Sequence, residues 1–145
     1  MHVAARWAVI QVSELMSNNV LTLRENASVG RAYAEMKLGR IRHFPVVNPA
    51  GEVVGVLSSL DVARALATDG RGRAVPVKDI MSTRVQTVGE DVPAWQAARI
   101  LRQKKIGALP VVDDAGALVG IITDSDFLEV AERVLAGRKP RRARA

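Results

Sequence analysis

The chain has 145 residues, 48% of them apolar, which favours a globular fold of one domain, or of two small domains that share a core, over a disordered chain. It contains no cysteine, which excludes disulfides, thiol catalysis and thiolate metal sites, and charged residues interrupt every apolar stretch before the roughly 20 residues that a membrane-spanning helix needs. The net charge of +6 arises mainly at the C-terminal end, because five of the 21 basic residues lie in 138–144 and the other 16 face 15 acidic residues.

The first predicted elements follow an N-terminal segment, residues 1–11, which carries no convincing cleavage site and is too short to span a membrane. We therefore expect a cytoplasmic protein. A short strand is predicted for residues 20–23, and Ser28 has the residue type and position of a helix N-cap. The helix that follows has one apolar stripe, which contains Val29, Ala32, Tyr33 and Met36.

Two strands and a closing helix complete this first block. The strands are predicted for residues 44–47 and 53–57, and the turn Asn48-Pro49-Ala50-Gly51 joins them. Their nearly continuous apolar content indicates a sheet covered by helices. The closing helix is predicted for residues 60–66, and a linker rich in glycine and charge for residues 68–76.

The rest of the chain repeats this block. A shift of 65 residues aligns 12–66 with 77–131 without a gap, and 16 of the 55 aligned positions are identical. The second block has Pro93 at its helix start, a turn at residues 113–116 and a closing helix over 125–135.

The two repeats are predicted to span residues 12–67 and 77–135. A repeat of this size buries too little apolar surface to form a stable domain readily on its own. We therefore expect a mixed α/β fold in which the repeats bury their apolar faces against each other as a pseudo-twofold pair.

The C-terminal residues 136–145 form a basic tail. Such a tail is typical of a solvated, disordered chain end. Its alternative role is salt-sensitive, sequence-independent binding of nucleic acid, which truncation at Gly137 would abolish.

Three motifs recur in register in the two repeats. In the first repeat they are Glu14-Leu15-Met16-Ser17, Arg42-His43-Phe44-Pro45-Val46-Val47 and Gly55-Val56-Leu57-Ser58-Ser59-Leu60-Asp61. In the second they are Asp79-Ile80-Met81-Ser82, Gly107-Ala108-Leu109-Pro110-Val111-Val112-Asp113 and Gly120-Ile121-Ile122-Thr123-Asp124-Ser125-Asp126. With the order β-α-β-β-α in each repeat, the chain resembles a tandem pair of CBS (cystathionine β-synthase) domains, often called a Bateman module, over residues 12–131.

This resemblance implies that the chain binds an adenosine derivative such as AMP, ADP, ATP or S-adenosylmethionine in clefts between the repeats. Each cleft would take the [Ser/Thr]-x-x-Asp segment of one repeat and the threonine and pre-proline strands of the other. The first implied cleft combines Ile122, Thr123, Ser125 and Asp126 with Thr22, Ala27, Ile41, Arg42 and His43. The second combines Ser58, Leu60 and Asp61 with Thr87, Val92, Ile106 and Gly107.

The chemistry of these segments has two interpretations. A strand that ends in Ser or Thr and enters a helix presents backbone N–H groups that suit a phosphate, and an aspartate three residues later can accept hydrogen bonds from ribose hydroxyls. The same pattern, in Ser58–Asp61 and Thr123–Asp126, is also a helix capping box. Capping and binding can coexist.

The two implied clefts differ in charge. Arg42 and His43 correspond to Gly107 and Ala108 in the second repeat, so the cleft containing Asp126 is the better candidate for a phosphorylated ligand. Alternatively, Arg42 pairs with Glu52 or another surface acid. His43 can equally be a partly exposed strand residue without a role.

Other polar and aromatic residues have simpler interpretations. Trp95 is expected at a helix interface between repeats or subunits, and Lys104 and Lys105 at a solvated helix end unless they reach the Asp61 cleft. Asp113-Asp114 fits turn chemistry better than a metal site. No nucleophile and base set is present, so we expect neither an enzyme nor a required cofactor.

The sequence therefore predicts a regulatory nucleotide sensor that acts as an isologous homodimer or through an unidentified effector protein. The alternative is an interaction scaffold that keeps the fold without binding a ligand.

Overall fold

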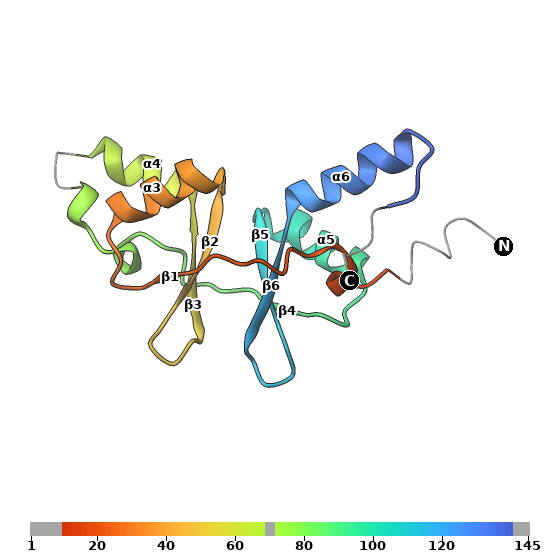
Figure 1. Ribbon diagram of the computed structural model, residues 1–145, viewed down its shortest axis with the longest axis horizontal. Coiled ribbons are helices and arrows are strands. Elements are labelled where there is room, and N and C mark those ends of the chain that lie inside the picture. The colour runs from red at the N-terminus through yellow and green to blue at the C-terminus, as the bar shows by residue number, and fades with distance from the viewer. Residues whose placement is uncertain (1–9, 69–71, 141–145) are drawn as a thin grey trace. The chain divides into compact units, whose positions relative to one another are not determined.

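The computed structural model describes residues 10–68 and 72–140, which fold as two compact units (Figure 1). The first unit contains residues 21–85. In the described part, the second unit contains residues 86–140 together with the N-terminal residues 10–20. Each unit has one three-stranded sheet with its own helices, so the mixed α/β class predicted from the sequence is confirmed.

The sheet of the first unit consists of β1 (Leu23–Arg24), β2 (His43–Val47) and β3 (Val53–Ser58). β1 runs parallel to β2, and β2 runs antiparallel to β3. The helices of this unit are α3 (Val29–Gly39) and α4 (Ser59–Ala67), and two 3-10 turns follow them, η1 (Gly72–Ala74) and η2 (Val77–Asp79).

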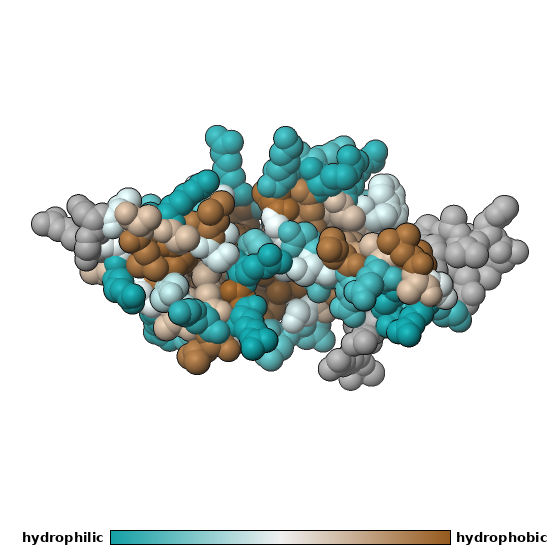
Figure 2. Space-filling model, turned by 90° about the horizontal axis from the view of Figure 1, so that it is seen from above, coloured by the Kyte–Doolittle hydropathy of each residue, from teal (hydrophilic) through white to brown (hydrophobic). Residues whose placement is uncertain are grey.

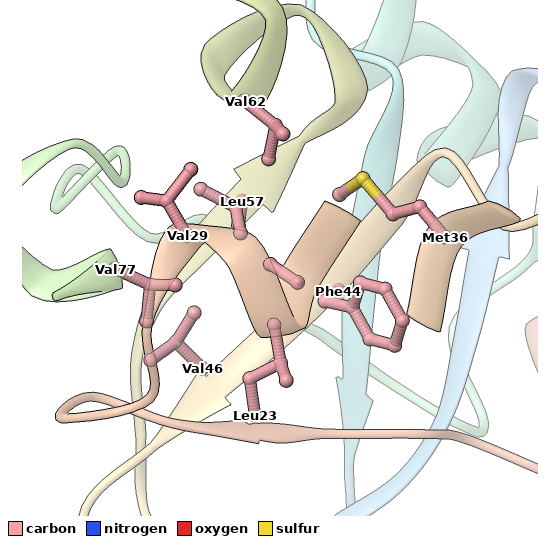
Figure 3. Packing of buried hydrophobic residues seen from close by; sticks show 9 residues of the cluster. Leu23, Val29, Met36, Phe44, Val46, Leu57, Val62 and Val77 are labelled. Atoms are coloured by element: carbon pink, nitrogen blue, oxygen red, sulfur yellow. The ribbon is translucent and has the colours of Figure 1, made fainter. Parts of the chain in front are cut away.

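The core of the first unit lies between its sheet and its helices. Figure 3 shows Phe44 and Leu57 of the sheet facing Met36 of α3 and Val62 of α4. Val77 of η2 joins the same cluster. Full burial of each such side chain stabilises the fold by about 1.5–3 kcal/mol.

The second unit has the same order of elements. Its sheet consists of β4 (Val88–Gly89), β5 (Ala108–Val112) and β6 (Leu118–Thr123), with β4 parallel and β6 antiparallel to β5. Its helices are α2 (Val12–Leu15), α5 (Ala94–Lys104) and α6 (Asp124–Leu135). No helix in the described ranges has the length and apolar character that crossing a membrane requires.

The order strand, helix, strand, strand, helix is confirmed in both units. Ser28 caps α3 as predicted, because its hydroxyl accepts a hydrogen bond of 3.1 Å from the Arg31 N–H. The bounds predicted for the first strand, residues 20–23, are wrong, since β1 contains only Leu23 and Arg24, which pair with β2. Pro93 is the N-cap of α5 rather than its first residue.

The compact units do not coincide with the sequence repeats. The segment containing Met16 and Ser17 pairs with β6 of the second unit, where the backbones of Ser17 and Ile121 exchange hydrogen bonds of 2.9 and 3.0 Å. The backbones of Val56 and Ser82 make the equivalent exchange in the first unit. Each unit is therefore completed by the opening segment of the other repeat.

Both chain segments expected to be irregular contain ordered contacts. In the predicted linker, the Val75 carbonyl accepts a hydrogen bond of 2.8 Å from the Val29 N–H, so this part packs against the start of α3. In the predicted tail, the Arg133 guanidinium donates to the Lys139 carbonyl over 2.7 Å. Residues 69–71 and 141–145 lie outside the described ranges.

Candidate functional site

The predicted ligand-binding segments lie where a strand enters a helix without a loop. Ser58 is the last residue of β3 and the N-cap of α4, and Thr123 is the last residue of β6 and the N-cap of α6. This direct transition places the backbone N–H groups of the first helical turn beside the strand end. It is the arrangement that the sequence predicted for both repeats.

Both aspartates cap their own helices. In the first unit, the Ser58 N–H donates to Asp61 Oδ2 over 2.9 Å, and the Asp61 N–H donates to the Ser58 hydroxyl over 3.1 Å. In the second unit, the Thr123 N–H and hydroxyl donate to Asp126 Oδ2 over 2.8 and 3.2 Å. The capping interpretation is therefore confirmed.

The capping hydrogen bonds involve only one of the two oxygens of each carboxylate. All three hydrogen bonds to the aspartates end on Oδ2, and both side chains are half-buried rather than enclosed. These hydrogen bonds therefore leave Oδ1 of both aspartates without a capping role. Capping and ligand binding are thus geometrically compatible at Asp61 and at Asp126.

The surroundings of the Asp126 carboxyl shift its pKa. Burial raises the pKa of Asp126, and the neighbouring charges of Glu129 and Asp124 act in the same direction. The hydrogen bonds from Thr123 act against this rise but do not cancel it. A group that donates hydrogen bonds to the ionised carboxylate of Asp126 would lower its pKa again.

The pre-proline segments lie beside the capped junctions of their own repeats. His43 pairs with Ser58 in the sheet, and the Arg42 carbonyl accepts a hydrogen bond of 2.8 Å from the Ser59 N–H. Likewise, the Gly107 carbonyl accepts a hydrogen bond of 3.0 Å from the Asp124 N–H. The combination of either junction with the strands of the other repeat stays a prediction, because it joins residues of both units.

The remaining predicted residues differ in exposure. Thr22 is exposed just before β1, whereas Thr87 before β4 is half-buried. The fully buried side chain of Ile122 belongs to the core of the second unit, so only its backbone can reach a ligand. The other members of the set are half-buried or exposed: Ala27, Ile41 and Val92 are half-buried, and Leu60, Ile106 and Ser125 are exposed.

The structure decides between alternatives that the sequence left open for Arg42 and Asp113. Arg42 and Glu52 lie at opposite ends of the β2–β3 hairpin, so they do not form the ion pair considered for them. Asp113 accepts hydrogen bonds of 2.9 Å from the N–H groups of Ala115 and Ala117, which is turn chemistry as expected. Within the described ranges, no three metal-ligating side chains gather at one place.

A pocket in the first unit contains Ile41 and Arg42, two of the predicted ligand-binding residues, but its other lining residues were not predicted from the sequence. This pocket of about 390 Å³ opens between α3 and α4 and is lined in part by Lys37 and Arg40. From the sequence alone, Lys37 and Arg40 are typical of the solvated C-terminal end of a helix. The small side chain of Ala63 on α4, where the second repeat has Leu128, is the signal that could have indicated it.

The duplicated sheets and junctions agree with a known family. The profile of the CBS domain matches residues 12–68 and 77–133. The chain belongs to the CBS-domain family. Its motifs Met16-Ser17 and Met81-Ser82 therefore open two CBS domains, whose compact units exchange these opening segments.

Solved structures share the whole CBS pair. AcuB of Vibrio cholerae is 32% identical, with a TM-score of 0.78 over 88% of this chain and 94% of that chain. The CBS domain pair of protein MJ0100, solved with 5′-methylthioadenosine and S-adenosyl-L-methionine, is 31% identical, with a TM-score of 0.77 over 89% of this chain and 98% of that chain.

Curated relatives include much longer proteins. A homoserine O-acetyltransferase of Methanococcoides burtonii is 36% identical over 80% of this chain but only 23% of its own length. An L-aspartate semialdehyde sulfurtransferase of Methanocaldococcus jannaschii is 32% identical over 88% of this chain and 24% of its own length. The chain thus spans about a quarter of the length of these relatives.

Proposed function

We propose that this CBS pair is a regulatory module that binds an adenosine-containing ligand at its strand-to-helix junctions and is not itself an enzyme. The observation that carries the proposal is the half-exposed carboxylate at each junction, Asp61 and Asp126, which caps its helix through Oδ2 alone. Oδ1 can then accept hydrogen bonds from ribose hydroxyls, and the N–H groups of the helix start suit a phosphate.

The comparison with MJ0100 supports the ligand class. That CBS pair was solved with two adenosine compounds and is 31% identical to this chain over nearly its whole length. As part of the proposal, Arg42 and His43 make the Asp126 cleft the one suited to a phosphorylated ligand. AMP, ADP, ATP and S-adenosylmethionine are the compounds to test first.

Thermal unfolding in the presence of these compounds tests the proposal. A ligand at 100 times its Kd should stabilise the protein by about 2.7 kcal/mol. If no adenosine compound at millimolar concentration raises the Tm, the sensor proposal is wrong. If a partner protein raises it instead, the scaffold alternative is correct.

Calorimetry on aspartate variants locates the site. Asp126→Asn and Asp61→Asn keep an oxygen that can accept the capping hydrogen bond but remove the charge. Because a hydrogen bond to a charged group contributes about 1.5–3 kcal/mol, the variant at the occupied junction should bind roughly tenfold to hundredfold more weakly. Asp114→Asn is the matched control in an exposed turn and should bind like the parent.

We also propose an isologous homodimer formed through helix faces. None of the residues of α6 is buried, and Leu128 and Leu135 are 69% and 87% exposed. Figure 2 shows apolar side chains of this kind at the surface among hydrophilic ones. Sedimentation should give a dimer at micromolar concentration, which Leu128→Glu weakens; a monomer would refute this part of the proposal.

A further inference from the structure

The pocket in the first unit is built by side chains of two helices and the chain between α3 and β2. Its buried floor consists of Met36 of α3 and Val62 of α4, which are 7% and 2% exposed. The ring of Tyr33 and the side chain of Ile41 add apolar walls. With about 390 Å³, the pocket lies in the range of small-molecule sites.

The end of α3 fixes the shape of this pocket. The Ile41 N–H donates to the Met36 carbonyl over 3.1 Å, which is the hydrogen bond that closes a Schellman motif. The side chain of Ile41 then folds back over Gly39, where a β-carbon would lie only 2.9 Å from Ile41 Cδ1. The wall formed by Ile41 is therefore held by the backbone rather than by a flexible loop.

The pocket is also electropositive. Lys37, Arg40 and Arg42 contribute to its lining, whose described residues include no carboxylate. The Lys37 ammonium lies 5.0 Å from the centre of the Tyr33 ring, so an aromatic face and a cation stand side by side. An apolar floor beneath cations suits an organic anion with an apolar body.

The second repeat provides an internal comparison, because its equivalent positions have different chemistry. Ser59, Val62 and Ala63 correspond to the larger Asp124, Phe127 and Leu128, whereas the ring of Tyr33 is replaced by the small side chain of Ala98. The same helix pair thus folds without these side chains. The side chains that line the pocket are therefore specific to the first repeat and are not required by the fold.

We propose that this pocket binds a small organic anion that has one aromatic ring system or short acyl chain and one carboxylate or phosphate group. The pocket shares Ile41 and Arg42 with the residues predicted for the adenosine cleft, and Ser59 follows the Ser58 junction, but its floor and its cations Lys37 and Arg40 lie on and after α3 and on α4. Lys37 and Arg40 contact the anionic group, and Met36, Ile41 and Val62 contact the apolar body.

Titration with 1-naphthoate, followed by the backbone amide NMR signals, tests the site. We expect shifts concentrated in residues 33–42 and 59–63. Ala63→Leu introduces the side chain of the second repeat and should weaken binding at least tenfold. Ala67→Leu adds the same atoms to α4 outside the pocket and should leave binding unchanged.

The neutral analogue 1-naphthalenemethanol separates the contribution of charge. Lys37→Gln should weaken naphthoate binding by up to about fivefold, as expected for an exposed charge pair, and should leave binding of the alcohol unchanged. Parent-like naphthoate affinity in Ala63→Leu, or shifts that map outside the two segments, would overturn the proposal. Titrating AMP into the same samples shows independently whether the adenosine proposal holds.

Discussion

Met16 of the first repeat packs directly against Gly120 of the second. A β-carbon built on Gly120 would lie 2.5 Å from Met16 Sδ and 3.0 Å from the Ser17 carbonyl oxygen. Met81 occupies the equivalent place at Gly55. The recurrence of both a Met-Ser opening and a strand glycine thus has one physical cause, which is the close passage of one repeat's opening segment over the other repeat's last strand.

This packing predicts that Gly120→Ala destabilises the second unit. The added methyl group overlaps Met16 Sδ and lies tightly against a backbone oxygen that cannot move freely, so the free energy of unfolding should fall by about 1–3 kcal/mol in urea denaturation. Met16→Ala removes one of the two clashing groups. In the double variant, part of the loss should be recovered, and strictly additive effects would show that the two residues do not interact.

The fold could be predicted largely from the sequence because its patterns are local. Apolar periodicity, the Ser28 cap and the hairpin turns each depend on a few neighbouring residues. The exchange of segments is not local. Met16 and Met81 are equivalent in the repeat, so the alignment alone does not say which repeat's glycine each one contacts.

The candidate site, like the fold, could be predicted from the sequence only where its pattern is local. The positions of Asp61 and Asp126 at helix starts follow from a four-residue pattern, and their capping is confirmed. The burial that raises the pKa of Asp126 depends on tertiary packing and has no sequence signal. The pocket beside Lys37 likewise depends on how closely α3 and α4 pack.

The raised pKa of Asp126 predicts a stability that falls with pH. Over the interval between the ordinary aspartate pKa and the raised value, the native carboxyl keeps a proton that the unfolded one has lost. The contribution of this group is therefore complete below its unfolded pKa and is lost as pH rises through the folded pKa. Urea denaturation from about pH 3 to pH 7 should show this loss in the parent and a flatter profile in Asp126→Asn.

The same carboxyl can be followed directly by NMR titration of its Cγ. Thr123→Val removes the hydroxyl that donates to Asp126 Oδ2 over 3.2 Å, so the pKa of Asp126 should rise further in that variant. A lower pKa in Thr123→Val would contradict the role given to this hydrogen bond.

Loss of the cap at α4 should be measurable in the first unit. Ser58→Ala removes the hydroxyl that accepts from the Asp61 N–H, and the free energy of unfolding should decrease by about 1 kcal/mol. Ser59→Ala, one residue later in the helix, is the matched control and should change stability by less than about 0.5 kcal/mol. Equal effects of the two substitutions would show that the cap does not contribute.

The C-terminal ends of α3 and α5 contain a strained residue in each repeat. Arg40 and Lys105 have φ angles of 53° and 55°, in the left-handed region where a β-carbon is unfavourable by roughly 1–2 kcal/mol. Glycine at this position releases the strain but loses more chain entropy on folding, so Lys105→Gly should raise the free energy of unfolding by up to about 1 kcal/mol. Lys104→Gly, one residue earlier inside α5, should lower it by about 1 kcal/mol because it lies in the helix. Thermal and urea unfolding of these two variants should therefore shift in opposite directions, and a loss of stability in both would show that the left-handed conformation of Lys105 is not strained.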